Sequence, residues 1–522
     1  MLTKIKVKNY KGFKEAEIPI KPITILLGAN SSGKSSMLQL LLLLQQTAEE
    51  ATESYKSALK IFGNRISIGK PENLFYGLNR KKPICIQIDL SNETLKERLT
   101  DAFTTFVFDI CYDYLGSDYV DSFFSQDRNK VVQALNEGLQ RLEKRGRRYG
   151  ISSFFVSTYD LHNKDTEAIM RNYDFLTNLY QNIKSSFFSV SYTISYFRKE
   201  LVISAFTIHN ENLAILSFDE NNGFSSGLTN LNENDNSLLK AAFSKNSTVF
   251  NSFNKKRFLD EDNTNRINTS IVKTIISITN NVLSELQKEF KEPCINHVSP
   301  LRAHPQRYYM LDKANISYSL DTYDANAIAE VIKEKTTIKD RVNDWFKKFG
   351  LKVDVDEFKE AIHKLTVQQS GLPLDIPDVG FGVSQVLPVV LQGFLSPNKS
   401  ITIVEQPEVH LHPKMQAALS DLFIDITKES KFTKSLIIET HSEYLLKRLR
   451  RRMAEGENIT PDKVSINLFH SRTEKTSATI ENLPIENRGA FKWPEEYFDD
   501  ELYDDVVKFL ELQGDGDIHI NN

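Results

Sequence analysis

The chain has 522 residues, of which 40% are hydrophobic and 26% are charged, a composition typical of folded globular proteins and not of disordered ones. Its length exceeds what one hydrophobic core normally supports, so we expect two or three lobes. The 65 basic and 69 acidic residues give a net charge of -4, which excludes a global basic field for nucleic-acid binding and leaves only local patches.

Cysteine usage and apolar stretches predict a cytoplasmic location. The three cysteines, Cys85, Cys111 and Cys294, form no C-x-x-C pair, which fits a reducing compartment and argues against a disulfide scaffold or a cysteine-rich zinc site. The alternating first residues predict a strand and no signal peptide. The longest apolar stretches, 37–44 and 386–395, are far shorter than the roughly 20 residues that span a bilayer, so we expect no membrane contact.

Strand patterns open the chain. Residues 2–8 and 16–28 are predicted as strands, and 84–90 as a further short strand. Between about 91 and 295 apolar residues recur at helical spacing, most clearly in 131–142 and 271–286. We therefore predict an insertion that is mainly helical.

The middle of this insertion has a different pattern. Residues 187–197, 201–208 and 213–218 are rich in β-branched and aromatic side chains, which predicts an antiparallel meander that pairs with the first lobe. The Asn-rich stretch 209–268 is predicted as loop. After Pro300 we expect a helix at 338–349 and then alternating strands and helices to about residue 510.

The most specific motif follows the apolar run at 23–28. It reads G-x-x-x-x-G-K-S and continues into an apolar helix at 37–44, which is the context of a phosphate-binding P-loop. The glycines let backbone N–H groups face phosphates, Lys34 adds a positive charge, and Ser35 is placed to hold Mg2+. The predicted nucleotide-binding residues are Gly28, Ala29, Asn30, Ser31, Ser32, Gly33, Lys34, Ser35 and Ser36.

A P-loop alone is compatible with a kinase, a GTPase, a transporter subunit or a DNA-linked ATPase, so further motifs must decide. The apolar strand at 401–404 ends in Glu405 and Glu408. Glu405 would support Mg2+, and Glu408 would orient or deprotonate the attacking water. The alternative, a solvated turn, is less favoured because a P-loop stands in the same chain.

A third strand, at 435–438, leads to His441, which could contact a γ-phosphate or the attacking water; the alternative is a structural histidine. The Gly-bearing loop at 378–385 opens the helix 386–395 and predicts a second anion site. One nucleotide needs only the P-loop, so the second site is explained most simply by a symmetric dimer in which it closes over the partner's nucleotide. The alternative is a tight turn.

The order of these motifs resembles the ABC-type ATPases related to structural-maintenance, recombination-repair and OLD proteins. The strings at 379–388, 405–413, 439–452 and 493–500 resemble the bacterial AAA15-like ATPases with a DUF3696 C-terminus. The resemblance implies an α/β fold in which an ABC-type P-loop ATPase lobe is split by a mainly helical insertion with an antiparallel β meander.

The implied domains are an N-terminal ATPase part at 1–90, the insertion at 91–298, a C-terminal ATPase part at 299–510 and a tail at 511–522. The resemblance further implies ATP and Mg2+ as cofactors, Lys34, Glu408 and His441 as catalytic residues, and Ser35 and Glu405 as metal ligands. Gly382, Ser384 and Gln385 would act in trans as the signature loop. The implied assembly is a homodimer with two composite ATP sites, with a higher oligomer left open.

Several features depart from the wider ABC pattern. The signature reads Phe-Gly-Val-Ser-Gln instead of Leu-Ser-Gly-Gly-Gln, and Glu405 stands where Asp is usual. The stretch 68–75 occupies the region of the Q-loop without an assignable glutamine. By resemblance, His410 and His412 fall in the loop across the dimer interface; a metal pair is the alternative, although no third ligand is nearby in the sequence.

The leading functional hypothesis is a sensor or regulatory ATPase of bacterial anti-phage defence, as in Septu-type or retron-associated systems, that controls a separate effector such as an HNH-type nuclease. OLD relatives carry a fused nuclease after the switch histidine. Here Asp515 and Asp517 formally match an Asp-x-Asp metal motif, but they lie in the tail without a preceding strand, so we expect no nuclease in this chain.

The alternative hypothesis is a DNA-repair or recombination clamp that binds nucleic acid directly. Basic clusters at 141–148 and 447–452 could follow a phosphate backbone. They could equally be solvated helix faces or pair with the acidic C-terminus. A transporter ATPase is a distant third, because no membrane-coupling feature supports it.

Overall fold

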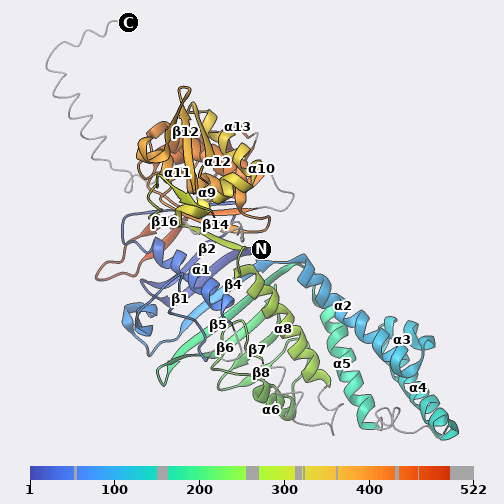
Figure 1. Ribbon diagram of the computed structural model, residues 1–522. Coiled ribbons are helices and arrows are strands. Elements are labelled where there is room, and N and C mark those ends of the chain that lie inside the picture. Colours follow the sequence, from blue (N-terminus) through green and yellow to red (C-terminus); the bar gives the residue numbers. More distant parts are fainter. Residues whose placement is uncertain are drawn as a thin grey trace. The chain divides into compact units, whose positions relative to one another are not determined.

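The computed structural model describes residues 1–51, 56–149, 163–253, 270–311, 320, 324–359, 362–428, 434–456 and 458–493 (Figure 1). The chain divides into two compact units. Unit 1 consists of Met1–Lys11 and Leu41–Lys291, and unit 2 of Gly12–Leu40 and Glu292–Asn522. The predicted nucleotide motifs all fall in unit 2.

Unit 1 contains an antiparallel sheet with the strand order β1-β4-β5-β6-β7-β8. Its strands are β1 (Leu2–Tyr10), β4 (Ile84–Ser91), β5 (Phe187–Phe197), β6 (Glu200–Asn210), β7 (Leu213–Asp219) and β8 (Gly223–Ser225). The predicted meander is confirmed, and it joins the first lobe because β5 pairs with β4, with Ile194 opposite Ile84. Alternate residues of β4 are buried, as expected of a strand with one face on the core.

Unit 1 also contains several helices (Figure 1). They are α2 (Glu93–Ile110), α3 (Val120–Phe124), α4 (Arg128–Tyr149), α5 (Asn163–Asn182), α6 (Glu233–Ala242) and α8 (Ser270–Phe290). The helices predicted from the spacing in 131–142 and 271–286 are therefore confirmed. α2 begins after Asn92, whose side chain accepts from the Leu95 N–H, and its apolar stripe packs against α5 and α8.

The prediction of loop across 209–268 is wrong for its described part. That part contains the end of β6, both β7 and β8, and α6. Asn232 and Asp235 form a capping box that starts α6. Abundant Asn therefore marks a helix cap and turns within folded structure, and 254–268 lies outside the described residues.

Unit 2 is built on a six-stranded sheet with the order β17-β16-β3-β15-β14-β9. The strands are β3 (Ile23–Gly28), β9 (Ile295–Val298), β14 (Ile401–Glu405), β15 (Ser435–Glu439), β16 (Val464–His470) and β17 (Thr479–Leu483). All neighbours are parallel except β16 and β17. Every residue of β3 is buried, which is typical of a parallel strand covered on both faces.

The predicted single strand at 16–28 is wrong. Instead, β2 (Phe13–Pro19) ends before Pro22 and β3 begins at Ile23. Proline lacks the N–H that a continuous strand would pair, so the chain breaks there.

A smaller sheet and further helices belong to the described part of unit 2. The small sheet contains β10 (Tyr309–Met310), β11 (Leu351–Lys359), β12 (Ile362–Gln369) and β13 (Leu372–Asp375). The helices are α1 (Lys34–Glu49, which continues into unit 1), α9 (Ala325–Glu334), α10 (Thr336–Lys347), α11 (Phe381–Leu395), α12 (Pro413–Lys428) and α13 (Glu443–Glu455). α10 confirms the helix predicted at 338–349, whereas α9 was not predicted.

The architecture confirms the predicted fold class, an α/β P-loop lobe split by an insertion of helices and an antiparallel meander. The division into 1–90, 91–298 and 299–510 stays a prediction, and 511–522 lies outside the described residues. Among the helices that the structure describes, none is long and apolar enough to cross a bilayer.

The buried face of β16 offers a test of this core. Ile466 is fully buried in the cluster that lines the parallel sheet, whereas Ile480 on the neighbouring β17 is half-buried. We expect Ile466→Ala to lower the free energy of unfolding by about 2–5 kcal/mol because it removes buried methyl groups and leaves a cavity. Ile480→Ala should lower the free energy of unfolding by clearly less. Urea denaturation measures both, and equal losses would contradict the assigned core.

Candidate functional site

The P-loop backbone is held tightly between strands of unit 2. Gly28 ends β3 with φ +143°, and Gly33 precedes α1 with φ +106°, values that side-chain-bearing residues rarely adopt. A Cβ at Gly28 would lie 2.5 Å from the Phe469 carbonyl oxygen, and one at Gly33 would lie 2.5 Å from the Phe13 ring. Both glycines are therefore required for the loop to curl as it does.

The side chains of the loop suit a phosphate group. Lys34 is 3% exposed, and its Nζ donates to the Gly28 carbonyl (2.7 Å) and the Ala29 carbonyl (2.9 Å). Burial lowers the pKa of Lys34, and the nearby Glu439 carboxylate opposes that shift. The buried Ser32 Oγ has no hydrogen-bond partner among the described residues. An ammonium group and an unsatisfied hydroxyl at a helix N-terminus fit a bound anion.

The exposure of the remaining loop residues is consistent with this reading. Ala29, Asn30, Ser31 and Ser35 are exposed, and Ser36 is half-buried. Ala29, Asn30 and Ser31 therefore lie at the surface of the loop, while Lys34 is buried beneath it.

Three parallel strands bring the other predicted residues to the same edge. β15 lies between β3 and β14, with Glu439 opposite both Leu26 and Glu405. The carboxyl ends of parallel strands meet at one edge of a sheet, so the residues after each strand converge on the P-loop. The structure thus assembles Lys34 and Ser35 with the acidic strand ends, as the sequence predicted.

Glu408 accepts two hydrogen bonds from the residues that directly follow β15. Its Oε2 accepts from the Thr440 hydroxyl (2.8 Å), and its Oε1 accepts from the His441 backbone N–H (2.6 Å). Burial raises the pKa of Glu408, although these two hydrogen bonds and the Arg302 charge favour the ionised form. A carboxylate with a raised pKa is well suited to accept a proton from water near neutral pH.

His441 lies beside this carboxylate with a lowered pKa. Burial is the main cause, and the Lys34 ammonium adds to it by repulsion. The imidazole is therefore neutral at neutral pH, so one ring nitrogen can donate a hydrogen bond and the other can accept one.

Glu439 is a site residue that the sequence reading missed. It is 4% exposed, its Oε1 lies 3.8 Å from Lys34 Nζ, and Ser35 Oγ donates to its Oε2 (3.5 Å). Burial raises the pKa of Glu439, Lys34 opposes this shift, and Glu405 adds to it by repulsion. The available signal was a charged residue at the end of an otherwise apolar strand.

Glu405 lies near these groups but has a partner of its own. Its Oε1 is 2.6 Å from Nε2 of His297 on β9, the strand next to β14. Glu439, which contacts Ser35, is therefore a third candidate metal ligand beside the predicted ligands Ser35 and Glu405. Their hydroxyl and carboxylate oxygens fit a hard divalent cation that also binds substrate phosphates.

The predicted signature residues lie at the start of α11. A Cβ at Gly382 would lie 2.8 Å from the His410 carbonyl oxygen, so this helix packs closely on the loop after β14. Ser384 and Gln385 are only 6% and 4% exposed, whereas a Cβ at Gly380 would meet nothing within 4 Å. There is therefore open space beside Gly380, the residue before α11, but Ser384 and Gln385 are buried in unit 2.

The two histidines after β14 are both exposed. His412 caps the next helix, because its Nδ1 accepts from the Lys414 backbone N–H (3.2 Å) at the start of α12. Within the described part of the chain, no group of three or more His, Cys, Asp or Glu residues is arranged to hold a metal ion. The metal-pair alternative for His410 and His412 gains no support.

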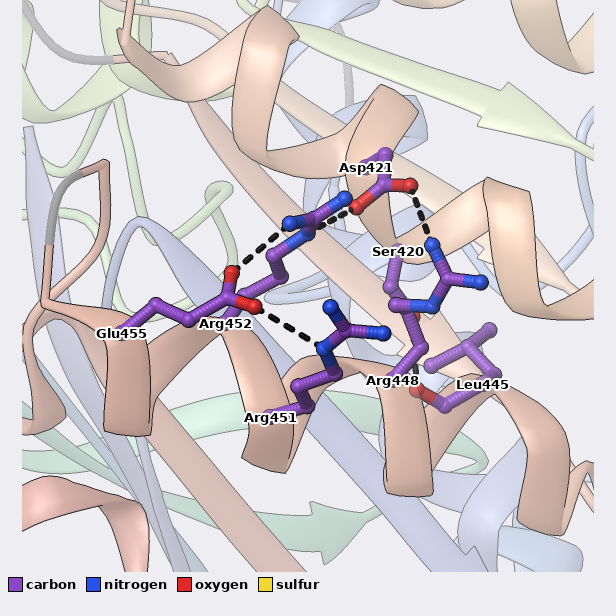
Figure 2. Close-up of polar contacts among 7 residues, drawn as sticks. All are labelled: Ser420, Asp421, Leu445, Arg448, Arg451, Arg452 and Glu455. Atoms are coloured by element: carbon purple, nitrogen blue, oxygen red, sulfur yellow. Dashed lines mark hydrogen bonds and ion pairs between the residues drawn. The ribbon is translucent and has the colours of Figure 1, made fainter.

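The basic cluster at 447–452 is largely paired within unit 2 (Figure 2). Arg448 and Arg452 both donate to Asp421 on α12, at 3.0 and 2.6 Å, and Arg451 and Arg452 both donate to Glu455, at 2.8 and 2.7 Å. The expected pairing with the acidic C-terminus is not needed for these arginines, and that segment lies outside the described residues. α13 therefore presents less uncompensated charge than its sequence suggests.

The other basic cluster is described only at its beginning. Arg141 is exposed, with its NH1 3.5 Å from Asp118 Oδ2 and its guanidinium over the Tyr119 ring. The side chains at 144–148 lie outside the described residues, so this cluster stays a prediction.

A P-loop on a parallel sheet, with an acidic strand end and a buried carboxylate beside it, defines a P-loop ATPase. The sequence matches the AAA ATPase domain family (AAA_15) over residues 1–446, and the chain belongs to this family. It is therefore a nucleotide-binding ATPase. No match was found among curated proteins.

Solved structures similar to this chain include heads of SMC proteins. The SMC head bound to the C-terminal winged-helix domain of ScpA is 11% identical, over 93% of this chain and 98% of that one, with a TM-score of 0.37. The SMC head domain from Thermotoga maritima is 9% identical, over 93% and 99%, with a TM-score of 0.35. The Pyrococcus furiosus Smc head with an extended coiled coil is 12% identical, over 98% and 99%, also at 0.35.

The raised pKa of Glu408 predicts the pH dependence of hydrolysis. We expect the rate at saturating ATP to fall on acidification with a midpoint above the ordinary glutamate pKa, because the predicted base, Glu408, must be ionised. Thr440→Val removes a hydrogen bond to the ionised form and should move the midpoint up by about one pH unit. The protonation of ATP is the same in both proteins, so an unmoved or lowered midpoint would contradict the assignment.

Proposed function

We propose that this protein is a Mg2+-dependent cytoplasmic ATPase that dimerises around two ATP molecules and regulates a separate effector in bacterial antiviral defence. The observation that carries the proposal is the set of hydrolytic groups at the ends of β3, β14 and β15. In the described residues no group of three or more His, Cys, Asp or Glu residues is arranged to hold a metal ion, and we assign the effector chemistry to another protein.

Each group at this edge has a proposed task. The loop from Gly28 to Ser36 binds the phosphates, with Lys34 beneath it. Ser35, Glu439 and Glu405 would hold Mg2+, which supplies charge neutralisation for the phosphates. Glu408 positions the attacking water and accepts its proton, while neutral His441 is available for a hydrogen bond at the reacting phosphate.

The proposed homodimer places the start of α11 against the partner's nucleotide. The open space beside Gly380 and the N-terminal backbone of α11 support such a contact. Gly382 would take part through its backbone. Because Ser384 and Gln385 are buried, their side chains would contribute only after the first turn of α11 moves. A higher oligomer is compatible with this dimer.

The regulatory role is supported by how the chain is divided. Unit 1 contains none of the predicted ATP-site residues, although it takes up Met1–Lys11 and Leu41–Lys291. The motif strings at 379–388, 405–413 and 439–452 resemble ATPases of defence systems, in which the effector is a separate protein such as an HNH-type nuclease. We assign unit 1 to trigger or effector recognition.

The alternative, a repair or recombination clamp of RecF or SMC type, requires direct DNA contacts. The pairing of Arg448, Arg451 and Arg452 with Asp421 and Glu455 reduces the basic surface available for such contacts on α13. We therefore keep the regulatory hypothesis as the leading proposal, with the clamp as the alternative.

Dimerisation can be tested by blocking hydrolysis. Glu408→Gln should lower kcat by about 100- to 1,000-fold because it removes the base, while ATP binding is retained. With ATP, this variant should elute as a stable dimer in size-exclusion chromatography with light scattering. Lys34→Ala, which loses the phosphate contact, should remain monomeric under the same conditions. A monomeric Glu408→Gln protein that still binds ATP would refute the composite site.

The effector can be sought with the protein at its native locus. We expect gentle purification in ATP, followed by mass spectrometry, to recover a stoichiometric nuclease or other toxic enzyme. Glu408→Gln should change the activity of that partner; an unchanged activity would show that hydrolysis is not the switch. Recovery of an isolated homodimer with nucleic acid attached would favour the clamp hypothesis instead.

A further inference from the structure

Arg302 lies beyond the end of β9 in unit 2 and belongs to none of the motifs predicted from the sequence. It is only 6% exposed. Its NH1 donates to the Gln385 carbonyl (2.9 Å), and its NH2 donates to the carbonyls of Glu405 (2.9 Å) and Gln406 (3.2 Å). One guanidinium therefore joins the first turns of α11 to the end of the acidic strand β14.

A contribution to the stability of the fold does not explain well why an arginine is buried at this position. Burial lowers the pKa of Arg302 to about 10, and the nearby carboxylates of Glu408 and Glu405 oppose this effect. Its Nε has no hydrogen-bond partner among the described residues. A buried charge with an unsatisfied donor is costly, and apolar replacements of buried ions are often neutral or stabilising.

The turn that carries Glu408 is fixed from two sides. Gln406 has φ +43°, an unusual value for a residue with a side chain. Its N–H donates to the Glu439 carbonyl on β15 (2.8 Å), and its own carbonyl accepts from Arg302. Glu408 follows two residues later and reaches back to the end of β15. β15 thus binds the N–H of Gln406, and Arg302 binds its carbonyl.

We infer that Arg302 is a positioning residue that fixes the start of α11 against the Glu405–Glu408 turn and thereby holds Glu408 in place for hydrolysis. The inference rests on the proposed role of Glu408 as the catalytic carboxylate. Through Arg302, a movement of the first turns of α11 is transmitted to the catalytic turn of the same chain. Signature-loop engagement and hydrolysis are thereby coupled within one protomer.

The shape of guanidinium explains why lysine cannot replace it. NH1 and NH2 point in different directions and bind two separate backbone segments at once. A lysine ammonium is a compact point charge, which keeps the positive charge but cannot span both segments. Arg302→Lys therefore separates the bridging geometry from the charge, and Arg302→Met removes both.

Steady-state kinetics with ATP and Mg2+ test the inference. We expect Arg302→Lys to lower kcat by about 10- to 100-fold through misplacement of Glu408. Its KM and its affinity for a fluorescent ATP analogue should stay near wild type, because no P-loop contact changes. Arg341→Lys is the matched control: Arg341 packs over the Phe394 ring near the other end of α11 and should leave kcat unchanged. Thermal melting of every variant monitors folding.

A double mutant shows whether Arg302 acts through Glu408. If it does, Arg302→Lys combined with Glu408→Gln hydrolyses no more slowly than Glu408→Gln alone. Wild-type kcat in Arg302→Lys would overturn the inference, as would a parallel loss of kcat, ATP affinity and melting temperature. If Arg302→Met fails to fold, Arg302→Lys decides. A fully active Glu408→Gln single variant would instead refute the proposed function on which the inference rests.

Discussion

The parallel register of β3, β15 and β14 is the constraint on which the functional site depends. Because β15 separates the P-loop strand from the acidic strand, Glu439 faces Leu26 on one side and Glu405 on the other. Segments more than 350 residues apart in sequence, at 28–36 and 405–441, are thereby placed at one edge of one sheet. Unit 2 can include the whole site because its two stretches, before and after the insertion, supply adjacent strands.

This arrangement concentrates acidic and basic side chains in a buried site with little access to water. Glu408 and Glu439 have pKa values raised by burial, and Lys34 has one lowered by burial. Such groups are costly unless each is compensated by partners. Here the Lys34 ammonium is held by loop carbonyls, Glu408 by Thr440 and His441, and Glu405 by His297. A bound nucleotide with its cation would complete this network, which explains why the site tolerates so much buried charge.

Local motifs were the part of the site that the sequence could reveal. The P-loop is recognisable from a motif of eight consecutive residues, and the strands that precede Glu405 and His441 follow from apolar runs. Glu439 and Arg302 were missed because their importance arises from neighbours that are remote in sequence: Ser35 in one case and Gln385 in the other. No periodicity or spacing encodes such contacts. The loop predicted at 209–268 failed for a related reason, because Asn at a helix cap resembles Asn in a loop until its partner Asp235 is seen.

The central claim is that the ends of β3, β15 and β14 form one site for ATP and its metal ion. The most direct measurement is an experimental structure of the Glu408→Gln protein with ATP and Mg2+. The account predicts the phosphates on the loop from Gly28 to Ser36 and the metal ion in contact with Ser35 and a carboxylate of Glu439 or Glu405. Nucleotide bound elsewhere, or a metal ion that none of these three residues approaches, would contradict it.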